Sequence, residues 1–320
     1  MQEPAEPPGT DGAPFEHRLT SILDVARLHR TAVALDDLTE LLPESAPRDS
    51  EGLSRWLADH PQVGEVIGPL AGRPGALPAP TLLDERRARG VAYRQAAERL
   101  VGETLRPVGP LVRCVGLTGS AAYLEPEEGD DLDLLVVTRS GALWVFLSYT
   151  YLALHLRRRG AMAPGVDPCL NFVMDDVEAG VEFGRPRGFL FAREALTTRP
   201  LDGEEYLRGL VSANPWLGEE VPRLYARWTS GGAKADPRPR PAPRAIQALN
   251  LALFLPMSAY LQLVGLVRNH RARRRGDPDP GFRTITRLRR LCFQSDRFVR
   301  LHRVYEGAPS AHAPPSEVPG

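Results

Sequence analysis

Apolar residues recur at helical spacing in three stretches near the N-terminus. FEHRLTSILDVARLH, LDDLTELLP and SEGLSRWLADH have the three-to-four-residue period of amphipathic helices, and VGEVIGPLAG is short enough for a pair of strands. A long polar helix is expected to follow near residues 81–105. The pattern predicts a small helical module over residues 15–80, and the order of its elements also suits a winged helix.

Between Leu111 and Met174 the pattern changes to alternation of apolar and polar positions. Strand, turn, strand, helix and strand follow one another there, which is typical of an α/β or α+β core. Stretches rich in Pro, Gly and Ser divide the chain and are expected to be linkers or disordered. We therefore predict an α+β protein with these parts: a disordered segment 1–14, the helical module 15–80, a mixed-sheet core with its leading helix 81–200, a helical C-terminal region 201–305 with a linker near 230–243, and a disordered tail 306–320.

Composition narrows the function without identifying it. The chain has 320 residues, of which 42% are hydrophobic, so it can bury a sizeable core in two or three units. Lys plus Arg and Asp plus Glu both number 40, so no global field favours nucleic acid or anionic membrane. The three cysteines lie far apart, and the N-terminal MQEPAEPPGTDGAP does not resemble a signal peptide. A reducing cytoplasm is the expected location.

The sequence lacks the residues that several catalytic and binding sites require. Lys234 is the one lysine, and its surroundings, GGAKADPRPR, match neither a phosphate loop of the GxxxxGK[ST] type nor a Schiff-base site. The seven histidines are scattered without metal-ligand spacing. DNA binding by the N-terminal module is disfavoured, because the helix that would read DNA sets Arg55 against Glu51 and Asp59.

The stretch LTGSAAYLEPEEGDDLDLLVVT carries the strongest chemical signal. A buried strand, LVRCVGLT, runs into Gly119 and Ser120, whose N–H groups and hydroxyl can cradle phosphate oxygens. In the next strand Asp131 and Asp133 are two positions apart, so both carboxylates lie on one face and suit Mg²⁺ or Mn²⁺. The alternative is that Asp130, Asp131 and Asp133 only cap a solvated strand edge. Against this, Asp133 lies among aliphatic residues, where an acid needs a partner.

TGS followed by DDLDLLVVT resembles the active-site signature of the nucleotidyltransferase superfamily with a DNA polymerase β-like fold. GALW, CLNFVMDD and FLFAREALTTRPLDGEEYLRGLVSANPWL extend a resemblance to uncharacterised bacterial nucleotidyltransferase-domain proteins over roughly residues 30–305. The resemblance implies that Gly119 and Ser120 bind the phosphates of an NTP such as ATP. It also implies that Asp131 and Asp133 bind the metal while NMP is transferred to an acceptor.

The sequence departs from this signature in two places. AAYLEP follows Gly-Ser where many small members continue with Ala-Arg-Gly, and CLNFVM offers Asn171 where the superfamily usually supplies a third carboxylate. An amide can bind a metal or orient an acceptor, but it cannot act as a general base near neutral pH. We expect Asn171 to lie beside Asp131 and Asp133, with Glu194 and Trp216 positioning helices around the site.

Three functions therefore remain open. The leading one is a metal-dependent nucleotidyltransferase that uses Asp131, Asp133 and Asn171 and transfers NMP to an unidentified acceptor. The second is a catalytically impaired nucleotide-binding or regulatory module. The third is a membrane-associated or scaffolding protein. The sequence does not identify the acceptor or the oligomeric state.

The third alternative depends on the uncharged stretch AIQALNLALFLPMSAYLQLVGLV, residues 245–267. It is long enough to span a membrane, and RARRR follows shortly after it. Its polar residues Gln247, Asn250, Ser258 and Gln262 nevertheless gather on one helical face and leave a wide apolar face for packing. We therefore predict a buried helix of a soluble protein in preference to a membrane segment.

Overall fold

The computed structural model describes residues 15–123, 126–127, 130–157, 168–276, 281–295 and 299. The chain divides into two compact units: residues 1–78 with 221–223, and residues 79–220 with 224–320. The segments expected to be disordered, 1–14 and 306–320, lie outside the described residues.

The first unit consists of three helices and a three-stranded antiparallel sheet of order β1-β3-β2. Leu19, Leu38 and Leu53 are fully buried between its helices. Asp49 caps α3 by accepting a hydrogen bond of 2.7 Å from the Gly52 amide. The strand pair predicted from VGEVIGPLAG is confirmed. The elements are α1 (Glu16–Leu28), β1 (Val33–Ala34), α2 (Leu35–Leu41), α3 (Ser50–Asp59), β2 (Glu65–Ile67) and β3 (Leu70–Gly72).

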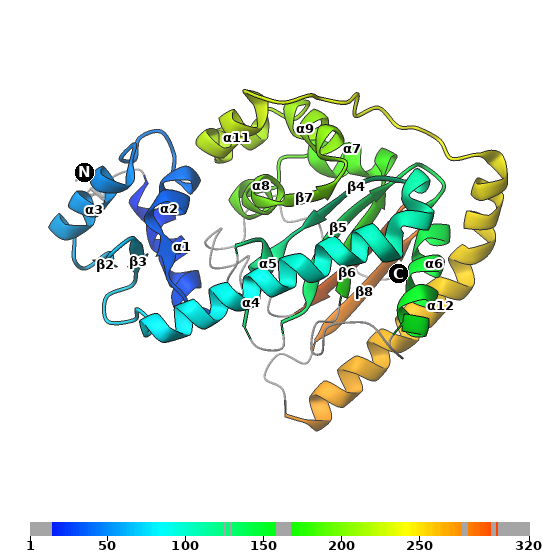
Figure 1. Ribbon diagram of the computed structural model, residues 1–320, viewed down its shortest axis with the longest axis horizontal. Helices are drawn as coiled ribbons and strands as arrows, with labels where there is room; N and C mark the ends of the chain where they lie inside the picture. The colour runs from blue at the N-terminus through cyan, green and yellow to red at the C-terminus, as the bar shows by residue number, and fades with distance from the viewer. Residues whose placement is uncertain are drawn as a thin grey trace, which may run out of the picture. The chain divides into compact units, whose positions relative to one another are not determined.

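The second unit is built on a six-stranded mixed sheet of order β7-β4-β5-β6-β9-β8 (Figure 1). The pair β5–β6 is parallel because α6 (Leu143–Arg157) crosses between its strands, and the other neighbours are antiparallel. The predicted α+β class with a mixed sheet is therefore confirmed. The strands are β4 (Val112–Leu117), β5 (Leu132–Thr138), β6 (Pro168–Asp175), β7 (Arg199–Asp202), β8 (Phe282–Arg287) and β9 (Arg290–Ser295).

Helices α4 and α6 share one hydrophobic core with the sheet. Leu134 and Val136 of β5 pack in this core with Trp144 of α6 and Ala97 of α4, all fully buried. The indole N–H of Trp144 donates to the Leu288 carbonyl oxygen at 2.9 Å, which satisfies its one donor. The helices not yet named are α4 (Pro80–Arg99), the π-helix η1 (Leu100–Leu105), the 3₁₀-helix η2 (Arg106–Leu111), α5 (Gly119–Ala122), α7 (Asp176–Gly184), α8 (Gly188–Thr197), α9 (Glu204–Ser212), α10 (Trp216–Glu220), α11 (Pro222–Thr229) and α12 (Arg244–Arg274).

The C-terminal region is not wholly helical, which corrects the prediction for residues 201–305. FRTITR and RLCFQS form β8 and β9, an antiparallel pair that adds to the core sheet through β6. β-Branched and aromatic residues favour strands in these two segments. The prediction missed them because the long helical stretch before them led the whole region to be assigned as helical. Residues 230–243, expected as a linker, hold no helix or strand apart from one isolated bridge between Ser140 and Pro241.

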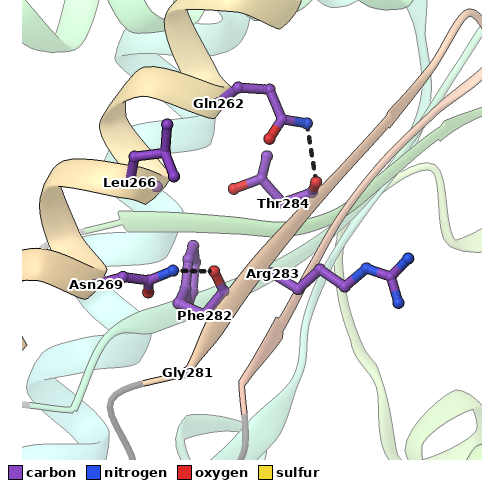
Figure 2. Close-up of a pocket in the computed structure, with 8 residues that line it drawn as sticks. Gln262, Leu266, Asn269, Gly281, Phe282, Arg283 and Thr284 are labelled. Atoms are coloured by element: carbon purple, nitrogen blue, oxygen red, sulfur yellow. Dashed lines mark hydrogen bonds between the residues drawn. The ribbon is translucent and has the colours of Figure 1, made fainter. Parts of the chain in front are cut away.

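The uncharged stretch 245–267 forms the greater part of α12, and the prediction that this helix is buried is wrong. Only 17% of its most apolar window is buried, and it is the one helix of the described chain long and apolar enough to cross a membrane. The side of α12 that packs on the domain carries both kinds of side chain: Gln262 and Asn269 bond to β8 (Figure 2), and Leu261 is buried in the core. Half of the exposed large apolar side chains among the described residues lie on α12: Leu249, Leu251, Leu255, Tyr260, Leu263, Val264, Leu266 and Val267.

Candidate functional site

The turn after β4 brings Gly119 against Asp133. The Thr118 amide donates to the Asp133 carbonyl oxygen at 3.0 Å, which closes the end of the β4–β5 ladder. Gly119 has φ +67°, and a Cβ added there would lie 2.5 Å from Asp133 Oδ2. Glycine is therefore required both by the backbone conformation and by the close approach of a carboxylate.

Asp130 organises the loop that leads into β5. Its Oδ2 accepts hydrogen bonds from Ser120 Oγ at 2.8 Å and from the Glu127 amide at 2.9 Å. Its carbonyl oxygen accepts from the Tyr93 hydroxyl at 2.7 Å. The Ser120 hydroxyl, expected to bind phosphate, thus donates to a carboxylate oxygen in this structure.

Glu194 of α8 occupies the other side of the turn. Its carboxylate accepts a hydrogen bond from the Gly119 amide, and burial raises the pKa of Glu194 against the opposing effects of Arg193 and that hydrogen bond. The guanidinium of Arg193 lies 4.6 Å from the centre of the Tyr123 ring, just after α5. Glu194 thus contacts the turn directly, whereas the buried Trp216 donates to the Phe183 carbonyl oxygen at 2.6 Å, and their expected role in positioning helices around the site stays a prediction.

Asp131 forms an ion pair with Arg268 of α12, at 3.5 Å between the Arg268 guanidinium and Asp131 Oδ2. The same guanidinium lies 4.2 Å from the centre of the Phe282 ring. Sequence analysis missed Arg268, because an arginine in a basic run at a helix end gives no sign of a partner so far away in the chain. Arg268 places a positive charge beside Asp131.

Cys169 lies opposite Asp133 in the parallel β5–β6 pair. Burial raises the pKa of the Cys169 thiol, and the nearby charges of Asp133 and Asp131 raise it further, while Arg268 lowers it. The thiol therefore stays protonated near neutral pH and is a poor nucleophile. Sequence analysis set this cysteine aside as isolated, although its position two residues before Asn171 placed it in the same strand.

Asn171 lies within β6, so the predicted pairing of CLNFVM beside LDLLVV is confirmed. The register shifts between the Asp133–Cys169 and Leu135–Phe172 pairs, at the level of Asn171. The side chain of Asn171 is outside the described part of the chain. Its predicted approach to Asp131 and Asp133 therefore stays a prediction.

The two acids at the end of β6 have structural roles. Asp175 caps α7 by accepting from the Glu178 amide at 2.9 Å. Asp176 is fully buried and binds Arg113 at 3.0 Å and the Arg240 amide at 2.6 Å. Burial raises the pKa of both carboxyl groups. Neither supplies the third carboxylate that the resemblance implies at the position of Asn171.

The donor set suits Mg²⁺ or Mn²⁺ shared with a substrate better than a complete protein cage. Among the described residues, no three or more His, Cys, Asp or Glu side chains form a group that could hold a metal ion. Magnesium is commonly held by one or two carboxylates together with water and substrate phosphates. Asp131 and Asp133 are the two carboxylates that could hold such an ion, and the Asp133 carboxylate lies directly beside Gly119.

Two pockets lie along α12, and neither includes Gly119. One, of 420 Å³, separates α12 from β8 and is lined by Gln262, Asn269 and Thr284 among others (Figure 2). The other, of 610 Å³, lies on the helix itself and includes Arg268, Arg271 and Arg275. Both pockets therefore lie outside the turn that contains Gly119.

Comparison with known proteins adds no relative. No protein-family model matches the chain, and no curated protein or solved structure is similar to it. The functional argument therefore rests on the site itself.

Proposed function

We propose that this protein is a metal-dependent nucleotidyltransferase that transfers NMP from an NTP to an acceptor. The contact that carries the proposal is that of Gly119 with Asp133, in which a left-handed glycine after one strand leaves room for a carboxylate of the next. A Cβ at position 119 would lie 2.5 Å from Asp133 Oδ2. An acid that only capped a solvated strand edge would not require a glycine so close to its carboxylate. The arrangement agrees with the roles that the resemblance implies for these two residues.

The phosphate-binding groups are the Gly119 amide and the Ser120 hydroxyl. Both already donate to anionic oxygens, those of Glu194 and Asp130. A triphosphate carries several negatively charged oxygens that accept charge-assisted hydrogen bonds from such donors, so it can replace these carboxyl groups as the partner. Before nucleotide binds, Glu194 and Asp130 would keep the Gly119 amide and the Ser120 hydroxyl oriented by accepting their hydrogen bonds.

Asp131 and Asp133 would hold Mg²⁺ or Mn²⁺ against the triphosphate. The metal supplies neutralisation of the negative charge that develops on the phosphoryl oxygens. Before nucleotide binds, the Arg268 guanidinium offsets part of the negative charge of Asp131. Since Cys169 stays protonated and Asn171 carries no acid, the acceptor proton must leave to water, to the substrate or to another acid.

Catalytic impairment remains the competing interpretation, because no carboxylate stands at position 171. A nucleotide-binding module would keep the roles of Gly119, Ser120, Asp131 and Asp133 and lack turnover. Measured transfer to an acceptor separates the two functions, and metal-dependent binding separates both from a scaffold.

The first unit is proposed to dock a partner rather than DNA. Its order of helices and strands is that of a winged helix. The exposed face of α3, however, pairs Arg55 with Glu51 at 3.8 Å and ends at Asp59. A surface of this kind does not attract phosphates.

Replacement of both metal-binding acids tests the proposal. We expect Asp131→Ala with Asp133→Ala to abolish metal-dependent NTP binding, measured by calorimetry with Mg²⁺ or Mn²⁺, and transfer from labelled NTP. Asp37→Ala with Asp59→Ala is the matched control, because it removes the same charge from exposed positions of the first unit. Unchanged NTP affinity in a folded Asp131 and Asp133 variant would refute the metal site.

A further inference from the structure

The side of α12 that packs on the domain mixes polar and apolar side chains, whereas its exposed residues between 249 and 267 are apolar except for Gln262. The Asn250 side chain is buried and accepts from the Trp144 amide at 2.7 Å. Gln262 and Asn269 donate to backbone carbonyl oxygens of β8, at 3.0 and 2.9 Å (Figure 2). Leu255 and Leu263 of the same helix are 71% and 61% exposed. We call the exposed apolar side chains of residues 249–267 the outer face of α12.

The outer face is extended by neighbouring α6. Tyr151 of α6 and Tyr260 of α12 meet edge to face, with ring centres 6.2 Å apart. Leu152 and Leu156 of α6 are 59% and 61% exposed, and the two helices lie side by side (Figure 1). A continuous apolar surface of this extent is typical of an interaction site.

The arginines next to the outer face indicate that its partner is negatively charged. Residues 244–275 contain no Asp or Glu, and their arginines other than Arg244 gather after Val267 as Arg268, Arg271, Arg273, Arg274 and Arg275. The pocket of 610 Å³ is lined by Val264 and Val267 at one end and by Arg268, Arg271 and Arg275 at the other. Apolar side chains next to guanidinium groups complement the acyl chain and phosphate of an anionic phospholipid.

A second copy of the chain is a poorer occupant. If two outer faces packed in parallel, arginines would lie near arginines, and in either orientation residues 244–275 offer no carboxylate to pair with them. A bilayer supplies both the apolar medium and the negative headgroups.

The geometry also favours a helix lying on the membrane over one spanning it. Residues 245–267 extend about 35 Å at 1.5 Å per residue, enough for either arrangement. However, α12 is hydrogen-bonded to the domain near both ends of this stretch: through Asn250 near its start and through Asn269 just after its end. Spanning the bilayer would require all of these bonds to break.

We infer that the outer face of α12 docks the protein onto an anionic lipid bilayer, with Arg271 and Arg275 contacting headgroup phosphates. The inference does not depend on nucleotide transfer and concerns a surface outside the candidate site. It places the protein on the inner face of a membrane without contradicting the cytoplasmic location proposed from the cysteines.

Flotation of the purified full-length chain with vesicles tests the inference. We expect the protein to float with vesicles of equal parts phosphatidylglycerol and phosphatidylcholine and to remain unbound with phosphatidylcholine alone. Salt at about 1 M, which shortens the Debye length to about 3 Å, should release much of it. Leu255→Glu with Leu263→Glu should reduce the bound fraction about tenfold or more, because both side chains lose their burial in lipid.

Two further variants complete the test. Leu28→Glu with Ile67→Glu is the matched control, since these residues of the first unit are 56% and 62% exposed, and it should float like the wild type. Arg271→Gln with Arg275→Gln should bind anionic vesicles severalfold more weakly. Circular dichroism and thermal melting confirm that each variant folds.

Four results would overturn the inference. They are failure of the wild type to float, equal flotation on neutral vesicles, indifference to the leucine substitutions, and a dimer in solution that dissociates with those substitutions while no lipid is bound. Resistance of the bound protein to an alkaline carbonate wash would show insertion and overturn the surface-bound arrangement.

Discussion

Gly119→Ala isolates the contact on which the proposed metal site depends. The backbone at Gly119 has φ +67°, a left-handed conformation that costs a residue with a Cβ about 1–2 kcal/mol. The new Cβ would also lie 2.5 Å from Asp133 Oδ2 and 3.4 Å from Asp133 Cγ. The Asp133 carboxylate must therefore turn away, and an off-rotamer side chain costs about 0.5–1.5 kcal/mol more.

Gly276→Ala separates these two contributions. Gly276 belongs to the same unit, has φ +70°, and has nothing within 4 Å of an added Cβ. This control should lower the free energy of unfolding by about 1–2 kcal/mol, from backbone conformation alone. Gly119→Ala should lower it by roughly 1 kcal/mol more, because Asp133 is also displaced.

Urea unfolding followed by tryptophan fluorescence measures the stability difference, and calorimetry measures binding of NTP with Mg²⁺. Gly119→Ala should lose metal-dependent binding, whereas Gly276→Ala should retain it. Equal destabilisation by the two substitutions, or full NTP affinity in Gly119→Ala, would show that the contact with Asp133 carries neither strain nor function.

Two other predictions concern the acids and the amide around the same turn. Because burial raises the pKa of Glu194, the folded protein keeps this proton at pH values where the unfolded chain has lost it, so stability falls as the pH rises from about 4.3 through the raised pKa. Glu194→Gln should reduce that fall in urea titrations across this range, and identical pH profiles for both proteins would exclude the effect. Asn171→Asp should raise the rate of NMP transfer if proton removal limits the reaction, since a carboxylate can accept the proton. Nucleotide binding without transfer in the wild type would instead favour the catalytically impaired module. A structure that places the Asn171 side chain more than about 8 Å from both Asp131 and Asp133 would contradict both interpretations of Asn171.

The core of the fold and the turn could be predicted because local signals agreed there. Alternation in LDLLVVT, a Gly-Ser turn and an acid among aliphatic residues all indicated one strand pair, and β4 and β5 form it. The contact of Asp133 with Gly119 follows from that pairing. By contrast, Arg268 approaches Asp131 from a helix more than a hundred residues away, and no local pattern gives that approach.

The orientation of α12 could not be predicted from its polarity. A polar stripe on an apolar helix ordinarily faces water, and the prediction placed Asn250 and Gln262 there. In the structure Asn250 is buried and bonds to the Trp144 amide, whereas Gln262 stays exposed while its amide donates to the Thr284 carbonyl oxygen. A helical period shows that two faces differ, but the surroundings decide which one is buried.

The hydrogen bonds that hold α12 are made with segments on both sides of it in the chain, and this sets an order of events during synthesis. Trp144, the partner of Asn250, leaves the ribosome before the helix, whereas Phe282 and Thr284, the partners of Asn269 and Gln262, leave after it. At roughly 5–20 residues per second, β8 follows the apolar stretch by an interval on the order of a second. During that interval the nascent chain exposes a segment long enough to be captured by membrane-insertion machinery. Prompt pairing of β8 with α12 is therefore what commits this stretch to the folded domain.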